Sequence, residues 1–324
     1  MLLGRVEPKI LPDMAYDTPE LFVDLQSSHI HNKILNYRRE IDKSNVPKKV
    51  VHGTATHTLS HFNAISEEKL DKLMSRCKIT KCNLNPIDYK KIDISPLKPY
   101  FLEIINSSFR TSIFPASEKV GDISPIIKDK SDDRNDPNKY RPITRASYTA
   151  KLVELETYDQ LKELVELNNI LPHNQSAYRS LHSTETALTK IYSDLIVSKD
   201  QSAAFDTVDH ELLIADLFQL GLRSRALDYI RSFLTSRSYQ VTANGCTSDK
   251  RPLIFGVPQG SVLGPLLFVI YTQSLAAELE ALGVSYHMYA DDTQIYFEFD
   301  HDKVHEVKLK LSLIVEKVLR WMLS

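Results

Sequence analysis

Two adjacent aspartates, Asp291 and Asp292, are the residues of this sequence with the clearest potential for chemistry. They lie between two segments in which apolar and polar residues alternate, 284–288 and 295–299, so the sequence predicts two strands joined by a hairpin with the aspartates at its tip. Adjacent carboxylates repel each other, and a hard divalent cation such as Mg²⁺ relieves that repulsion. The alternative is a solvated Asp-Asp turn, because aspartate is common in turns.

A glycine-rich loop lies upstream of the predicted hairpin. Residues 255–268 have the sequence Phe-Gly-Val-Pro-Gln-Gly-Ser-Val-Leu-Gly-Pro-Leu-Leu-Phe. Glycines in such a loop let the backbone approach a ligand closely, and Gln259 supplies a side-chain amide at the same place. Pro265 suits the first turn of the apolar helix that we expect to follow.

The loop and the aspartate pair together resemble a known family. Residues 256–265 and the Tyr-Ala-Asp-Asp of residues 289–292 are similar to motifs B and C of reverse transcriptases, and most similar to those of non-long-terminal-repeat (LINE-type) retrotransposons. Three earlier segments fit the same order. These are a segment similar to the fingers motif near the incoming triphosphate, the stretch before motif A, and the second half of motif A, at residues 136–143, 175–188 and 202–210.

The resemblance implies a site for two-metal nucleotidyl transfer. In such a site, two divalent ions activate the 3′-hydroxyl of the primer and neutralise the leaving pyrophosphate. Asp291 and Asp292 match the motif C pair, and Asp200 is the candidate for the motif A aspartate because it lies five residues before Phe205. The resemblance therefore implies Mg²⁺ or Mn²⁺ as the cofactor, with Asp200, Asp291 and Asp292 as its ligands.

The same resemblance implies roles in nucleotide binding for five further residues. Gln259 and Gly260 would line the nucleotide and template pocket, and Phe205 would lie under the sugar and reject a ribose 2′-hydroxyl. Arg141 would meet the triphosphate oxygens, a task that suits a guanidinium, and Lys128 would make a second phosphate contact. Core packing is the alternative for Phe205, and an ordinary surface charge is the alternative for both basic residues.

The segment before Asp200 departs from the family. Family members carry an apolar strand of about half a dozen residues there, whereas this chain has only Ile-Val-Ser-Lys at residues 196–199. The residues before that segment already fit the apolar face of a helix that begins near Ser183. We therefore expect an internal deletion that removed the strand and its aspartate. The alternative is a shortened helix and a strand rebuilt from Val197 to Asp200.

Periodicity and capping residues predict the other elements. Ser66 is expected to cap a helix, and Asp206 and Asp209 are expected to cap another. Residues 123–128 predict a short edge strand, because Pro125 cannot donate to a central ladder. A basic stretch that includes Arg38 predicts a solvated helix face, with a nucleic-acid contact as the alternative. Helical spacing of apolar residues extends over residues 97–109, 151–167, 183–196 and 304–322.

Composition sets limits on the class of protein. The chain has 324 residues, of which 42% are hydrophobic and 25% charged, so it can bury a core of ordinary globular type. A formal net charge of −2 means that any binding of nucleic acid must come from local basic clusters. Its three cysteines fit neither a disulfide framework nor a zinc site. With no apolar stretch near 18 residues and no signal sequence, we expect no membrane contact and an intracellular location.

The sequence as a whole favours an α+β fold. The resemblance implies a right-hand polymerase with fingers and palm, a small antiparallel palm sheet and no thumb, since the family continues into the thumb beyond the point where this sequence ends. We expect a mostly helical leader over residues 1–114 and the polymerase domain over residues 115–324, with no endonuclease segment before it. The implied partners are an RNA template, a DNA primer and a deoxynucleoside triphosphate. The alternative function is a catalytically inactive, truncated remnant that at most binds nucleic acid.

Overall fold

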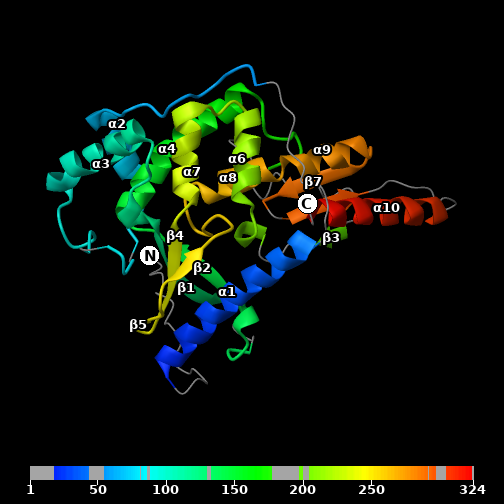
Figure 1. The fold of residues 1–324 in the computed structure, drawn as a ribbon, viewed down its shortest axis with the longest axis horizontal. Coiled ribbons are helices and arrows are strands. Elements are labelled where there is room, and N and C mark those ends of the chain that lie inside the picture. Colours follow the sequence, from blue (N-terminus) through cyan, green and yellow to red (C-terminus); the bar gives the residue numbers. More distant parts are fainter. Residues whose placement is uncertain are drawn as a thin grey trace, which may run out of the picture.

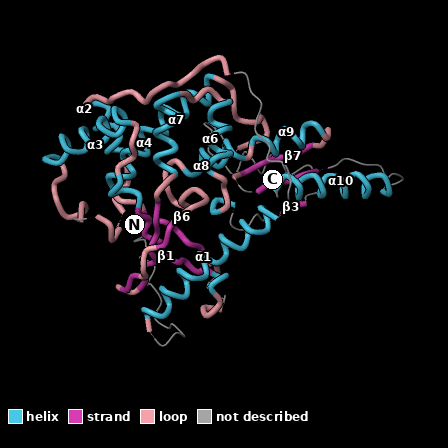
Figure 2. The backbone as a smooth tube through the Cα atoms, in the orientation of Figure 1, coloured by secondary structure: helices cyan, strands magenta, loops and turns pink. Residues whose placement is uncertain are grey.

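The computed structural model of the protein describes residues 18–43, 55–80, 82–85, 88–129, 133–176, 197–199, 204–290, 292–296 and 304–322. The helix expected at residues 183–196 and the candidate ligands Asp200 and Asp291 lie outside these residues. Figures 1 and 2 show a group of helices above a sheet that one long helix crosses, and a smaller sheet to one side. This mixture of helices and sheets confirms the α+β class.

The largest apolar core lies among six helices. Ser66 caps the first of them by accepting a hydrogen bond from the backbone N–H of Lys69, as the sequence predicts. Asp209 caps another by accepting from the N–H groups of Glu211 and Leu212. The six helices are α2 (Glu67–Arg76), α3 (Lys98–Thr111), α4 (Tyr148–Leu167), α6 (His210–Gln219), α7 (Ser224–Leu234) and α8 (Gly264–Tyr271).

A five-stranded sheet lies beside this core, and helix α1 (Pro19–Lys43) packs across it (Figure 1). Its order is β2-β1-β4-β5, with β6 also paired to β4. Strand β1 pairs in parallel with β4 and antiparallel with β2. The strands are β1 (Val120–Ile127), β2 (Tyr140–Arg145), β4 (Arg237–Ala243), β5 (Cys246–Thr247) and β6 (Arg251–Leu253).

The expectation that residues 123–128 form a short edge strand is confirmed for residues 124–127, which among the described strands pair with β2 alone, but the strand begins earlier, at Val120, and its first half pairs with β4. The parallel ladder with β4 covers only the first half of the strand and ends at the pair Ile123 and Val241. Pro125 lies beyond that point and faces Pro142 of β2, so neither proline interrupts the parallel ladder. Pro125 thus lies in the half of β1 that pairs on one side only among the described strands, as its missing N–H predicts.

A three-stranded antiparallel sheet forms the second layer of strands, in the order β3-β8-β7. Helices α9 and α10 pack with β7 in a separate apolar cluster, in which Ile314 of the final helix is buried. The pairing of β7 with β8 confirms the expected hairpin, and α10 confirms the expected last helix. The strands of this sheet are β3 (Val197–Lys199), β7 (Ser285–Tyr289) and β8 (Asp292–Tyr296), and the two helices are α9 (Gln273–Ala281) and α10 (Val304–Met322). The 3-10 turns of the described residues are η1 (Ser95–Leu97), η2 (Ala116–Lys119), η3 (Pro137–Lys139) and η4 (Ala204–Asp206).

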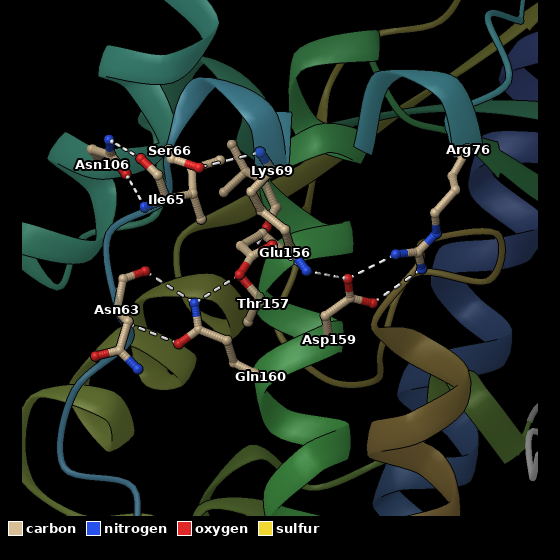
Figure 3. A network of polar contacts seen from close by, with 11 residues as sticks. Asn63, Ile65, Ser66, Lys69, Arg76, Asn106, Glu156, Thr157, Asp159 and Gln160 are labelled. Carbon is tan, nitrogen blue, oxygen red and sulfur yellow. Dashed lines mark hydrogen bonds and ion pairs between the residues drawn. The ribbon is translucent and has the colours of Figure 1, made fainter. Parts of the chain in front are cut away.

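The segment before residue 115 is fixed onto the helices that follow it. Figure 3 shows Lys69 and Arg76 of α2 donating to the carboxylate of Asp159 on α4, at 2.9 Å and 2.7 Å. Phe114 is fully buried and packs edge-on against Phe233 of α7, with the ring centroids 5.0 Å apart. Residues on both sides of the expected boundary thus share one core, and the boundary itself stays a prediction. None of the described helices has both the length and the apolar character of a membrane span.

Candidate active site

The hairpin of β7 and β8 presents Asp292 at its tip, as the sequence predicts. Asp292 is the first residue of β8, pairs with Tyr289 and is exposed. Ala290, the first loop residue, has a φ of 54°, which is the backbone conformation that a two-residue hairpin turn requires. Among the described residues no three His, Cys, Asp or Glu side chains gather closely enough to hold a metal ion, and Asp200 and Asp291 lie outside those residues.

A strand is present where the sequence led us to expect that one had been lost. Residues Val197–Lys199 form β3, which pairs antiparallel with the free edge of β8. A strand at Val197–Lys199 agrees with the second alternative, whose helix and whose last residue, Asp200, lie outside the described residues, and three backbone pairs with β8 stabilise this short segment. The last of these pairs joins Lys199 to Thr293. Asp200 directly follows Lys199 in the sequence, and Asp292 directly precedes Thr293.

The glycine-rich loop is held in place by close backbone contacts. The carbonyl oxygen of Gln259 accepts a hydrogen bond from the N–H of Thr144 at 2.8 Å. Gly260 has a φ of +109°, and a Cβ there would lie 2.4 Å from the carbonyl oxygen of Thr144. At the start of the loop, Gly256 has a φ of +82° and lies against the backbone of Asp206. Both glycines are therefore required by close approach and by positive φ.

A buried carboxylate supports the end of the same loop. One oxygen of Glu154 on α4 accepts hydrogen bonds from the N–H groups of Val262, at 2.6 Å, and Leu263, at 3.2 Å, where α8 begins. Glu154 is fully buried, which raises the pKa of its carboxyl group, while the Arg237 guanidinium lowers it. Glu154 is not among the site residues that the sequence predicts, because an acidic residue inside a helical pattern is typical of a helix surface. Nothing in the sequence distinguishes it.

Replacing Glu154 with leucine is expected to destabilise the protein by about 2–3 kcal/mol, because two buried N–H groups lose their acceptor. Glu154→Gln keeps a carbonyl oxygen of the same shape and is expected to retain at least half of that stability. Urea denaturation of the two variants beside the wild type measures the difference. Equal losses in both variants would contradict this account of Glu154.

Phe205 and Asp206 lie in the turn η4 (Ala204–Asp206). The ring of Phe205 stacks on Phe268 of α8, with centroids 4.4 Å apart, and its carbonyl oxygen accepts from the N–H of Val257. Phe205 is thus packed against the core and also joined to the glycine-rich loop. The expectation that Asp206 caps the next helix is wrong, because Asp209 occupies the cap and Asp206 belongs to the preceding turn.

The carboxyl group of Asp206 links stability to pH. Burial raises its pKa from 3.8 to about 6, and Lys33 opposes the shift. The folded protein therefore binds this proton more tightly than the unfolded chain does, and the associated stability is present below pH 4 and lost as pH rises toward 6. We expect Asp206→Asn to raise the free energy of unfolding by about 1–2 kcal/mol at pH 7.5 and to change it little at pH 4. Urea titrations at the two pH values measure this, and an equal effect at both would contradict it.

Lys128 and Arg141 lie on the hairpin of β1 and β2. Arg141 is exposed and pairs with Ile126, and the N–H of Lys128 donates to the carbonyl oxygen of Lys139. Side chains alternate along a strand, so the side chain of Arg141 lies on the opposite face of β2 from that of Thr144, whose backbone N–H contacts the glycine-rich loop. The structure therefore brings the two basic residues to one hairpin and leaves both exposed.

A small pocket lies between α1, the five-stranded sheet and the glycine-rich loop. Asp206 and Gln259 line it, together with Ile34 of α1 and Thr144 of β2. The pocket shows that four distant segments of the chain meet at Gln259. Among the described candidate residues, Phe205 is joined through Val257 to the loop that carries Gln259 and Gly260. Asp292 lies on the three-stranded sheet instead.

The sequence matches one family model and several known proteins. The family model for "Reverse transcriptase (RNA-dependent DNA polymerase)" matches residues 127–324. The RNA-directed DNA polymerase from the mobile element jockey of Drosophila funebris is 27% identical over 250 residues, covering 71% of this chain and 27% of that protein. The corresponding jockey protein of Drosophila melanogaster is also 27% identical, over 72% of this chain and 27% of its own length.

This chain thus spans about a quarter of the length of the relatives that it matches. Among solved structures, a chain of the partial Cas6-RT-Cas1--Cas2 complex aligns with 77% of this chain and 40% of its own length, at 17% identity and a TM-score of 0.39.

Proposed function

The chain belongs to the reverse transcriptase (RNA-dependent DNA polymerase) family, and we propose that it carries the RNA-directed DNA polymerase activity of a LINE-type retrotransposon. The observation that supports activity most strongly is the pairing of β3 with β8. It provides a strand in the segment before Asp200, where the sequence alone led us to expect a loss. The template would be RNA, the primer DNA and the substrate a deoxynucleoside triphosphate.

The candidate ligands suit a divalent metal ion. Asp292 presents an exposed carboxylate at the start of β8, Asp291 precedes it, and Asp200 follows the strand that pairs with β8. Carboxylate oxygens are the ligands that Mg²⁺ and Mn²⁺ prefer. We propose that these three aspartates hold the ions, which when bound supply charge neutralisation for the attacking and leaving oxygens. In this proposal the pairing of β3 with β8 brings the segments that carry the three aspartates together.

The remaining candidates would bind the nucleotide. We propose that Gln259 and Gly260 line its pocket, with the loop fixed by Thr144 on one side and by Glu154 on the other. Phe205 would support the sugar, since it is joined to the loop through Val257. A ring in that position would exclude a ribose 2′-hydroxyl by contact.

Arg141 and Lys128 would contact the triphosphate. Both are exposed on the hairpin of β1 and β2, where long basic side chains can reach an anionic ligand without prior desolvation.

In this proposal the five-stranded sheet and the helices around it form the fingers, and the sheet that carries Asp292 forms the palm. Residues 1–114 would be the leader and residues 115–324 the polymerase domain.

Primer extension on an RNA template with Mg²⁺ tests the proposed function. We expect template-directed incorporation of deoxynucleotides into a DNA primer by the full chain, and no incorporation when Asp291 is replaced by alanine. The alternative, an inactive remnant, predicts no incorporation by the wild type even where the protein binds the primer and template in a mobility-shift assay. Incorporation that survives Asp291→Ala would contradict the assignment of the site.

A further inference from the structure

Arg38, near the end of α1, is buried rather than solvated. The sequence predicts a solvated basic face for this helix, and Arg39 is indeed exposed, but the Arg38 residue is only 6% exposed. A guanidinium of this kind must be paired, because burial of an uncompensated charge is strongly unfavourable. The expectation is therefore wrong for Arg38. The reason is that its buried carboxylate partner, Asp209, lies 171 residues away in the sequence.

Two contacts join Arg38 to two segments of the candidate site that are far apart in the sequence. One guanidinium nitrogen donates to a carboxylate oxygen of Asp209 at 2.7 Å, and the side chains of both residues are 8% exposed. The guanidinium also lies over the ring of Phe255, 4.7 Å from its centroid. A third contact, with Asp42 at 3.1 Å, lies within α1 itself.

The two distant partners belong to the segments that carry the proposed nucleotide-binding residues. Asp209 follows the turn η4 with Phe205, and Phe255 begins the loop with Gln259. These two segments are also joined directly by backbone hydrogen bonds, such as that from the N–H of Val257 to the carbonyl oxygen of Phe205. Arg38 thus contacts the two segments at the point where they are joined.

Helix α1 also forms part of the wall of the pocket that contains Gln259. Ile34 and Ile30, which lie about one and two turns before Arg38, line that pocket together with Asp206. Both isoleucines are buried against the five-stranded sheet. The position of Arg38 is therefore fixed by a packed helix, which gives the guanidinium a defined geometry.

We propose that Arg38 is a positioning residue for nucleotide binding, which holds the segment of Phe205 and the loop of Gln259 in register from a helix outside the family match at residues 127–324. This inference rests on the proposed function for its effect on nucleotides. Helix α1 is then a part of the nucleotide site and not only a leader in front of it.

Steady-state primer extension with four variants tests the proposal. Arg38→Met removes both contacts, and Arg38→Lys keeps the charge but loses the planar group over Phe255. Because Arg38→Met leaves the Asp209 carboxylate buried without its cation and could unfold the protein, the double variant R38M/D209N removes both charges. Asparagine at position 209 still offers the oxygen that caps α6. Arg39→Met is the matched control, because Arg39 is exposed and its guanidinium donates to Asn36 of the same helix.

We expect the KM for deoxynucleotides to rise about tenfold in R38M/D209N, with kcat per active site changed less than about twofold. Arg38→Lys is expected to restore part of the wild-type KM, and Arg39→Met to match the wild type. A merely structural role would lower the active fraction and the melting temperature while leaving the KM unchanged. A folded R38M/D209N variant with a wild-type KM would overturn the proposal.

Amide hydrogen exchange separates this proposal from the proposed function. In R38M/D209N, the peptides that cover residues 204–209 and 255–263 are expected to exchange faster than in the wild type, with no change in α4. If the wild type does not extend primers, the proposed function fails, and the exchange result still decides whether Arg38 holds the two segments. Unchanged exchange in both peptides would overturn the role of Arg38 whatever the activity.

Discussion

Replacing Asp292 with asparagine is expected to lower the rate of primer extension by about a thousandfold, which corresponds to about 4 kcal/mol of transition-state stabilisation. Asparagine keeps the shape of the side chain but removes the negative charge that a divalent ion requires. Asp292 is exposed at the start of β8, so the free energy of unfolding is expected to change by less than about 0.5 kcal/mol. Single-turnover extension and urea denaturation measure the two quantities.

A matched control for this variant is Asp249→Asn. Asp249 is also exposed, but it lies in the connection between β5 and β6 of the five-stranded sheet and not in the β7–β8 hairpin. It is expected to leave both the extension rate and the stability at wild-type values. Extension by Asp292→Asn within about tenfold of the wild-type rate would remove Asp292 from the catalytic site.

The second large effect is expected from Gly260→Ala. A methyl group there would lie 2.4 Å from the carbonyl oxygen of Thr144, and the backbone φ of +109° disfavours any residue with a Cβ. We expect a loss of about 2–4 kcal/mol in the free energy of unfolding, or a displaced loop with a similar loss in nucleotide binding. Urea denaturation and the KM for deoxynucleotides together report both forms of the effect.

Gly245→Ala separates steric contact from backbone strain. Gly245 also has a positive φ, of +85°, but a Cβ there would meet no atom within 4 Å. The free energy of unfolding of this variant is expected to fall by only about 1 kcal/mol, because it has the backbone strain without the steric contact. Similar losses in the two variants would show that the close approach of Gly260 to β2 does not matter for the loop.

The sequence predicted the local features of the site well. The alternation of apolar and polar residues predicted the hairpin that carries Asp292. Ser66 predicted the cap of α2, and the glycine-proline pattern predicted the loop before α8. Each of these is decided by residues within one or two turns of each other. The order of the motifs indicated the family, and the family match over residues 127–324 confirmed that resemblance.

Features that depend on distant partners were not predictable. The strand β3 forms because the edge of β8 is free to pair, and nothing within residues 197–199 shows that edge. Glu154 and Arg38 look like surface charges in the sequence, and only the folded chain brings Val262 to the first and Asp209 to the second. The central place of β1 in its sheet likewise follows from pairing with β4, more than 110 residues later.

The most direct test of the site is the position of bound Mn²⁺ in crystals of the protein with a primer and an RNA template. Mn²⁺ replaces Mg²⁺ at oxygen ligands and is located by its anomalous scattering. The account predicts an ion within about 2.5 Å of carboxylate oxygens from Asp200, Asp291 and Asp292 together. An ion bound without Asp200, or no ion at the tip of the β7–β8 hairpin, would contradict it.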